Sequence, residues 1–550
     1  MKRRDFIKYF SGGLAGLTVG STTRFPLFGV DRAFGSTTAW KFGVMADTQW
    51  QTGSKAGGEP MSCAASIIDA LNEQFILHGC KLVIQVGDLV NNESVSSVRA
   101  LPTRAEHAVD LYNAGIAFYP IRGNHESSST AASEMRTLFP QNLGLGDYVF
   151  GGSNFNSPMD SLKGLSYILD YNDDRFVLID QFVRLDGTNA DGTSSYNNNL
   201  LDQIDWVEEN LSSRSSDMHA FVLSHKNLIG QNHKDVVTGS SLTANATERD
   251  RFLSIMNENG VGYYLGGHDH MHHRSLVTTS DKSASVNQII CSSNSYKFYI
   301  PGSGDDNRES PLEQELFTIG YYIFTVDGPR VTVDFYSSSH GQDYGDADLV
   351  NPPNSYTFYL RETFGYSLNG QRFEIAQGDS YTNVQDSYGS TTAKVLSGTN
   401  GNAETDYLGR SLSKSVSTGW SDPLTSDAAC SNVLTLWGMA DNLSLWNASL
   451  TGLLPSSDES EETDVYTLSL SYDPKLIRPS QAATGKFCLA SKDSDGSWVN
   501  AVDVNYSGSK KFKYGPWKSG YAVGTYGVDP TTSTVWAVLD HDGDFVAKIV

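Results

Sequence analysis

Cysteine is scarce in this chain, and its scarcity excludes two classes of protein. Only five cysteines occur among 550 residues, namely Cys63, Cys80, Cys291, Cys430 and Cys488, and none has CxxC spacing. This pattern excludes a zinc ribbon and a dense disulfide framework, and it leaves at least one cysteine unpaired. The sequence also contains no exact internal repeat.

Net positive charge is missing as well. The formal charge is -23 and the isoelectric point is near 4.8. Such a surface repels nucleic acid and anionic lipid, so we expect no nucleic-acid polymer as a partner, whereas a small anionic substrate remains possible at a metal site. The 39% hydrophobic and 11% aromatic content exclude a disordered chain. The length allows several units with a sizeable core.

The N-terminus carries a pattern of its own. Arg3 and Arg4 precede an aromatic residue, an aliphatic residue and a lysine, which resembles a twin-arginine export signal. The apolar stretch from Phe10 to Gly20 is far shorter than the roughly 20 residues that span a bilayer, so we expect no transmembrane anchor here. We therefore expect a signal peptide and linker over residues 1–39 and a periplasmic or extracellular protein. A basic arm that happens to precede apolar residues is the alternative.

From Trp40 onward, short apolar runs alternate with helix-like segments, which is typical of a layered α/β or α+β domain. The expected strands are Lys41–Met45, Leu82–Val86, Ala117–Ile121, Phe176–Ile179, Ala220–Leu223, Gly262–Leu265, Gln288–Cys291, Tyr321–Val326 and Arg330–Phe335. Apolar residues at helical spacing predict helices over Ala64–His78, Ala105–Ala114 and Leu200–Leu211, which would cover the sheet faces. A turn at Asp327-Gly328-Pro329 joins the last two strands.

The character of the sequence changes after the segment Ser337 to Tyr356, where Pro352-Pro353 breaks the periodicity. We expect a β-rich connecting region over 341–464, with an acidic linker at Asp458 to Asp464, and a small all-β sandwich over 465–550. Its expected strands are Tyr466–Tyr472, Gly485–Ala490, Val502–Tyr506 and Val535–Leu539. The segment Asp540 to Asp544 is too short for an EF-hand, which favours a hairpin turn.

Five polar clusters each follow an expected strand. They are Ala46-Asp47-Thr48-Gln49, Gly87-Asp88, Gly123-Asn124-His125-Glu126, Ser224-His225 and Gly266-Gly267-His268-Asp269-His270. Because α/β sheets present ligand groups at strand ends, these side chains are expected to converge. Taken singly, Asp47 and Asp88 could be helix N-caps and His225 a packed or surface histidine, while His268 to His273 could be an adventitious metal-binding tract. The ordered set favours one shared site.

In this order the clusters resemble the calcineurin-like metallophosphoesterase family, whose motifs are Asp-x-His, Gly-Asp, Gly-Asn-His-Glu/Asp, a lone His and Gly-His-x-His. The resemblance covers about residues 40–340 and implies a four-layer α/β (α+β) sandwich with two metal ions, to which the all-β C-terminal region is appended. Asp88 would bridge the metals. By resemblance, Asp47, Gln49 and His270 would complete the first site, and Asn124, His225 and His268 the second.

The resemblance further implies a hydrolase of phosphomonoesters, phosphodiesters or pyrophosphates. A metal-bridging hydroxide would be the nucleophile, and His125 would be the general acid that protonates the leaving group. His233, His272 and His273 lie nearby in the sequence but stay outside this core site. Loops such as Ser127–Asn156 and Asp186–Asn199 are expected to set selectivity.

Two positions depart from the family pattern. Gln49 replaces the usual histidine, and its amide oxygen favours manganese, iron or magnesium over zinc. In this respect the chain also resembles the manganese-dependent ADP-ribose and CDP-alcohol diphosphatases. Asn91 stands where many relatives carry an aspartate that orients the catalytic histidine, and Asn92 or Glu93 could take over that role.

Because Gln49 and Asn91 depart from the family pattern, a different class of function stays open. The protein could be a catalytically weak, metal-containing surface or matrix-binding protein that acts through its β-rich C-terminal region. The same region could instead add carbohydrate or lipid recognition to a working enzyme. Bound metal without turnover of a phosphoester would distinguish the binding protein from the hydrolase.

Overall fold

The structure is a computed structural model of the whole chain. It describes residues 39–55, 57–190, 198–302, 307–339, 356–376, 386–388, 391–397, 405–424, 427–439 and 465–550. Residues 1–38 of the expected signal segment and the acidic run Asp458 to Asp464 lie outside the described residues.

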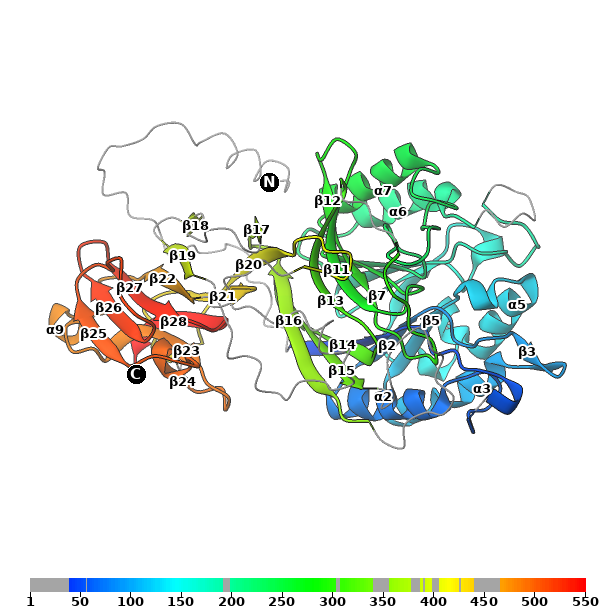
Figure 1. Cartoon of the computed structure of the whole chain (residues 1–550), viewed down its shortest axis with the longest axis horizontal. Helices are drawn as coiled ribbons and strands as arrows, with labels where there is room; N and C mark the ends of the chain where they lie inside the picture. Colours follow the sequence, from blue (N-terminus) through cyan, green and yellow to red (C-terminus); the bar gives the residue numbers. More distant parts are fainter. Residues whose placement is uncertain are drawn as a thin grey trace.

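Two large sheets form the N-terminal domain (Figure 1). The first sheet has the order β16-β15-β14-β1-β2-β5, in which β1, β2 and β5 are parallel. Its strands are β1 (Trp40–Met45), β2 (Leu82–Val86), β5 (Ala117–Ile121), β14 (Thr318–Asp327), β15 (Arg330–Ser339) and β16 (Tyr359–Ser367). The hairpin of β14 and β15 turns at Gly328, whose φ of 58° favours glycine.

The second sheet has the order β13-β11-β12-β10-β9-β8-β7-β6, and β8, β9, β10 and β12 run parallel. Its strands are β6 (Ser153–Asn156), β7 (Tyr167–Tyr171), β8 (Asp174–Ile179), β9 (Ala220–Ser224), β10 (Tyr263–Gly266), β11 (His272–Thr278), β12 (Ser285–Ile290) and β13 (Glu309–Glu315). The segments Phe176–Ile179 of β8 and Ala220–Leu223 of β9 are buried and wholly apolar, as expected for parallel strands covered on both faces.

Helices cover the outer faces of both sheets, which makes four layers. Helices α2 (Ala65–Leu77), α3 (Leu101–Glu106), α4 (Val109–Asn113) and α5 (Ser129–Leu138) lie on the first sheet, and α6 (Ile204–Ser212) and α7 (Ala246–Glu258) lie on the second. The layer between the two sheets is apolar, and side chains from both sheets pack together in it. It contains the stacked rings of Phe42 and Phe324. The expected four-layer fold is therefore confirmed.

Several local expectations are corrected. The expected helix Ala105–Ala114 is split into α3 and α4 because His107, at the break, accepts a hydrogen bond from Asn72 at its main-chain oxygen (2.7 Å). The loop expected at Ser127–Asn156 contains α5 and the short strand β6. Helix α7 and strands β7, β11 and β13 were not anticipated.

The C-terminal region forms a sandwich of two six-stranded sheets, ordered β17-β20-β21-β28-β23-β24 and β18-β19-β22-β27-β26-β25. The strands are β17 (Arg372–Ala376), β18 (Asp386–Tyr388), β19 (Thr391–Ser397), β20 (Ser413–Ser421), β21 (Val433–Trp437), β22 (Val465–Ser471), β23 (Phe487–Lys492), β24 (Trp498–Asn500), β25 (Lys511–Tyr514), β26 (Thr525–Asp529), β27 (Thr534–Leu539) and β28 (Gly543–Ile549). Both sheets combine strands from the expected connecting region and from the expected small sandwich. Strand β16, beyond the expected boundary, pairs with β15 in the first sheet.

Two further expectations fail in the sandwich. Residues Val502–Tyr506 form no strand, because a 3-10 turn covers Ala501–Asp503 and Asp540 then accepts the main-chain N–H of Tyr506. The segment Asp540 to Asp544 is not a hairpin turn, since β27 and β28 belong to different sheets and the segment crosses between them.

The sandwich packs against the side of the N-terminal domain where β16 runs (Figure 1). Arg330 of β15 donates to Thr435 in β21 at 2.8 Å, and Trp437 donates to Thr332 at 3.2 Å. The five cysteines are all buried and free. Among the described residues, no helix is long and apolar enough to cross a bilayer.

Candidate metal centre

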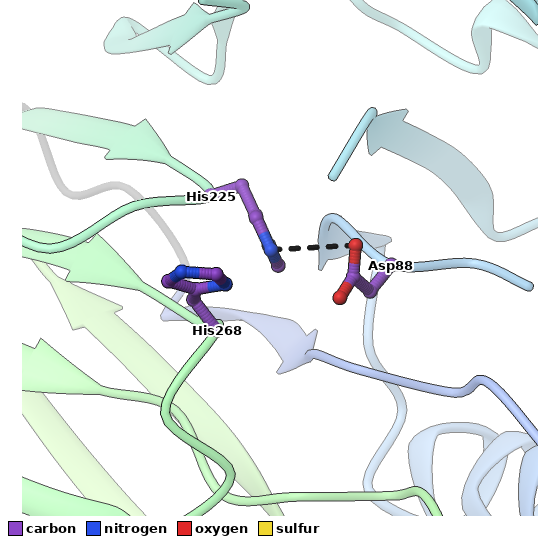
Figure 2. Close-up of side chains that lie close together, drawn as sticks. All are labelled: Asp88, His225 and His268. Carbon is purple, nitrogen blue, oxygen red and sulfur yellow. Dashed lines mark ion pairs between the residues drawn. The ribbon is translucent and has the colours of Figure 1, made fainter. Parts of the chain in front are cut away.

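The polar clusters found in the sequence meet where the parallel strands of both sheets end. Asp47, Asp88 and Asn124 follow β1, β2 and β5 of the first sheet. His225 follows β9, and His268 and His270 follow β10 of the second sheet. Figure 2 shows the His225 ring pointing at the Asp88 carboxylate, with His268 beside it. The two sheets thus deliver carboxylates and imidazoles to one place.

Glycines allow this close approach. A Cβ on Gly87 would lie 2.3 Å from His225 Nδ1, and one on Gly123 would lie 1.9 Å from Asp88 Oδ1. Gly87 also has a φ of 80°, a conformation that glycine adopts without penalty. The glycines that precede Asp88 and Asn124 in their motifs are therefore required, because no Cβ fits at these two positions.

Two groups of side chains can each hold a cation. One consists of Asp88, His225 and His268, and the other of Asp47, Asp88 and His270, and within each group the ligand atoms lie within 4.8 Å of one another. All five residues are buried. Asp88 belongs to both groups, which is the position that a bridging carboxylate occupies between two metal ions.

The two amide residues expected as ligands reach the same groups. Asn124 Oδ1 lies 3.0 Å from His225 Nε2, and Gln49 Nε2 lies 3.1 Å from Asp88 Oδ2 and 3.0 Å from His270 Nε2. Gln49 Oε1 is buried and accepts no hydrogen bond among the described residues. A buried amide oxygen normally has a partner, and with the amide turned over so that Oε1 takes the place of Nε2, a cation between Asp88 and His270 would supply one. The donor set therefore fits two divalent metals.

Main-chain carbonyls orient the histidine rings. His225 Nδ1 donates to the oxygen of Val86 at 3.0 Å, and His270 Nδ1 donates to the oxygen of Lys297 at 3.1 Å. In both rings this contact leaves Nε2 facing the carboxylates, since His225 Nε2 is 3.3 Å from Asp88 and His270 Nε2 is 3.5 Å from Asp47. Such contacts fix the tautomer of a metal-ligating histidine.

Electrostatics show that the carboxylate pair needs positive charge. Burial, and then the neighbouring Asp88, raise the pKa of Asp47 well above its usual range against the opposing effect of His225. Burial also opposes ionisation of Asp88, but His225 and His125 outweigh it and lower the pKa of Asp88. Burial lowers the pKa of His225, yet Asp88 and Asp47 prevail and raise it to about 9. His225 thus partly supplies the charge that a cation would provide.

His125 stands at the open side of the centre. Its ring is partly exposed, and Nε2 lies 3.8 Å from Asp88 Oδ2. Its Nδ1 donates to the main-chain oxygen of Asn91 at 2.6 Å, so a main-chain carbonyl orients the ring. Glu93 does not take this role, because it accepts from the hydroxyl of Ser128 at 2.6 Å.

Three residues at the site were missed by sequence reasoning. Asp235 Oδ1 lies 3.3 Å from His268 Nε2, Lys297 Nζ lies 3.4 Å from His125 Nε2, and the Tyr299 ring meets the His270 ring edge-on at 4.8 Å. Lys297 and Tyr299 belong to the loop after β12, which is parallel to β10. The end of a parallel strand was the signal that could have found them.

The histidines left outside the core site behave differently from one another. His233 stacks on His268 with ring centres 3.9 Å apart, and its Nδ1 lies 2.8 Å from Asp269. His272 stacks on Phe335, and His273 Nε2 lies 3.0 Å from the buried carboxylate of Glu309. His272 and His273 are thus explained by packing and ion pairing, whereas His233 lines the centre.

The comparison with protein families agrees with this geometry. Residues 41–272 match the family described as calcineurin-like phosphoesterase. The chain therefore contains a calcineurin-like phosphoesterase domain, and the ligand groups described above lie within the matched residues.

Solved structures with related folds were also found. GAP50, the anchor in the inner membrane complex of Plasmodium, is similar at 16% identity and a TM-score of 0.35, over 58% of this chain and 90% of that chain. The purple acid phosphatase PPD1 from yellow lupin seeds is similar at 14% identity and a TM-score of 0.36, over 59% of this chain and 58% of that one. A dimetal phosphatase from Danio rerio has 16% identity and a TM-score of 0.33, over 54% and 95%. No curated protein sequence matches the chain.

Proposed function

We propose that the protein is a metal-dependent hydrolase of phosphoesters. The observation that carries this proposal is the place of Asp88, which two groups of metal-ligating side chains share while the partly exposed His125 stands beside it. Bound divalent metals would supply positive charge for phosphoryl oxygens and make water a nucleophile at neutral pH.

The chain's own residues have distinct roles in this proposal. Asp47, Gln49 and His270 would hold one metal, Asn124, His225 and His268 would hold the other, and Asp88 would contribute to both sites. His125 donates a proton from Nε2 to the leaving oxygen, and its hydrogen bond to the Asn91 carbonyl keeps the ring aimed at that position. Such a donor favours catalysis over metal storage.

The metals are proposed to be manganese, iron or magnesium. An amide oxygen of Gln49 in place of an imidazole makes one site harder, which disfavours zinc relative to these ions. Competitive loading of metal-free protein, followed by elemental analysis and assay, measures this preference. Higher zinc occupancy and higher activity with zinc than with manganese would contradict it.

The test of function uses Asp88→Asn, a variant of nearly the same size and without the bridging charge. Wild-type protein loaded with manganese is expected to hydrolyse 4-nitrophenyl phosphate or bis(4-nitrophenyl) phosphate, and the variant is expected to lose at least about 1,000-fold in kcat/KM. Elemental analysis should show two metals in the wild type and fewer in the variant. Two bound metals with no turnover of either substrate would instead support the metal-containing binding protein.

We also propose export by the twin-arginine route, supported by Arg3 and Arg4 ahead of a weakly apolar stretch. Replacing both arginines by lysine is expected to retain the protein in the cytoplasm of the producing bacterium, as measured by cell fractionation. Unchanged export of this variant would contradict the route.

A further inference from the structure

A cavity of about 480 Å³ opens beside the metal centre. Residues 297–302 and Asn232 line it. This volume lies within the range of small-molecule sites and exceeds what a lone phosphoryl group needs. The cavity therefore has room for an organic group attached to the phosphate.

The wall of the cavity is continuous with the metal centre. Tyr299 meets the metal-ligand candidate His270 edge-on at 4.8 Å and meets His233 at 5.1 Å. Asn232 donates to the main-chain oxygen of Ile300 at 2.8 Å and ties the two walls together. A molecule in the cavity would thus contact the Tyr299 ring, which packs against the metal-ligand candidate His270.

Lys297 places a positive charge at the point where cavity and general acid meet. Its Nζ lies 3.4 Å from His125 Nε2 and 5.2 Å from the centre of the Tyr296 ring. His125 Nε2 is the atom proposed to protonate the leaving oxygen. Any group bonded to that oxygen must therefore pass within reach of the Lys297 ammonium.

We infer that residues 297–302 and Asn232 form a leaving-group subsite in which Lys297 binds a negative charge next to the scissile oxygen. This inference rests on the proposed function and narrows its substrate class. Metals bound at the centre would offer charge to the transferred phosphoryl group, whereas the Lys297 ammonium stands on the leaving-group side, next to His125, and attracts an anionic leaving group more strongly than a neutral one.

Two kinds of substrate carry such a charge. One is a phosphoester of a 2-hydroxy acid, whose carboxylate sits on the carbon that bears the scissile oxygen. The other is a phosphoanhydride, whose leaving group is itself a phosphate. In both cases water attacks phosphorus, the P–O bond to the leaving group breaks, and the leaving oxygen takes the proton from His125.

The experiment compares three substrates with metal-loaded full-length protein. Phosphoglycolate carries the carboxylate, 2-hydroxyethyl phosphate has the same skeleton with a neutral hydroxymethyl group, and inorganic pyrophosphate is the anhydride. Lys297→Gln is expected to lower kcat/KM roughly 10- to 100-fold on the charged substrate that the site accepts, and less than about threefold on 2-hydroxyethyl phosphate. Lys297→Arg, which restores the charge, should recover much of the loss.

The pattern of loss identifies the source of the charge. A loss on phosphoglycolate alone assigns a carboxylate, a loss on pyrophosphate alone assigns an anhydride, and a loss on both supports a subsite for either anion. An equal loss on all three substrates, or none, would overturn the inference. Lys510→Gln is the matched control, since Lys510 pairs with Asp503 on the exposed surface of the sandwich and should leave all three rates unchanged.

Binding separates this inference from the proposed function. If wild-type protein hydrolyses no phosphoester, the proposed function fails, and calorimetry with metal-loaded protein still tests Lys297. Phosphoglycolate or pyrophosphate should then bind at least about tenfold more tightly than 2-hydroxyethyl phosphate to the wild type but not to Lys297→Gln. Equal affinities in the wild type would overturn the subsite.

Discussion

Four of the eight side chains predicted for the metal centre are attached to backbone in the left-handed region. The φ angles are 51° for Asp47, 45° for Asp88, 73° for His268 and 53° for His270. Non-glycine residues adopt this conformation uncommonly, and it concentrates at sites where geometry is imposed by the surroundings. These residues are therefore placed for the centre at a local cost that the rest of the domain offsets.

A buried carboxyl away from the centre gives a pH-dependent prediction. Asp174 at the start of β8 is 4% exposed and accepts the main-chain N–H of His219 at 2.8 Å. Burial raises the pKa of Asp174 from 3.8 to about 7, despite that hydrogen bond. Since the folded-state pKa is above the unfolded one, the associated stability is present below about pH 4 and is lost as pH rises through about 7.

Asp174→Asn cannot ionise and should escape that loss. We expect the free energy of unfolding of Asp174→Asn, relative to wild type, to rise by up to about 4 kcal/mol between pH 4 and pH 7. Urea denaturation of both proteins across this range measures the difference, and effects of other titrating groups cancel in it. A difference that stays constant with pH would contradict the shifted carboxyl.

At the scale of elements, the strand ends decide the chemistry. Strands β2 and β5 were predicted to the residue because each is a short, mostly apolar run that is buried along its whole length. The break between α3 and α4 was not predictable, since it depends on contacts of His107 with Asn72 and Asp69 of α2. Sequence periodicity indicates which face of a helix or strand is buried. It does not indicate which contact with another element ends or breaks that helix or strand.

The turn after β5 provides a test at this scale. Gly123 has an ordinary backbone conformation, so its substitution by alanine acts only through the Cβ, which would lie 1.9 Å from Asp88 Oδ1. We expect Gly123→Ala to displace the Asp88 carboxylate, which both candidate ligand groups share, and to lower the proposed activity at least about 100-fold, with loss of bound metal. Steady-state kinetics with elemental analysis measures both effects.

Gly328→Ala is the contrasting variant. Gly328 has a φ of 58° in the turn between β14 and β15, and a Cβ there would meet nothing within 4 Å. This variant should lose about 1 kcal/mol of stability through backbone strain and keep its activity per folded molecule. Full activity and metal content in Gly123→Ala would show that the contact with Asp88 does not hold the centre.

At the scale of the whole molecule, the C-terminal sandwich is joined to the phosphoesterase domain by a buried charge network. Arg410, three residues before β20, lies 2.6 Å from Asp406 and donates to Gln231 Oε1 at 2.6 Å and to the fully buried Glu309. Glu309 also pairs with His273. The network thus connects the approach to the sandwich with β11, β13 and the segment before His233.

Removal of Arg410 should be costly. Arg410→Met removes the positive charge that the buried carboxylates of Glu309 and Asp406 share, and it leaves a buried negative charge uncompensated. We expect this change to lower the free energy of unfolding by about 3–5 kcal/mol. Lys510→Met breaks the exposed pair with Asp503 and should change it by less than about 1 kcal/mol. Urea denaturation measures both. A similar small effect for the two variants would show that the buried network does not stabilise the joined domains.

The sequence by itself determined the strand-linked motifs and the alternation of a layered α/β domain, because apolar periodicity and motif order are local properties of the chain. The family resemblance carried by those motifs implied the four-layer arrangement and the roles of the eight candidate ligand and acid residues. The tertiary structure alone decided that both C-terminal sheets combine strands from distant segments, that the Asn91 carbonyl orients His125, and that Lys297 stands beside it. These features depend on which segments of the chain lie next to one another in space. That proximity is fixed only when the strands have paired and the sheets have packed against each other.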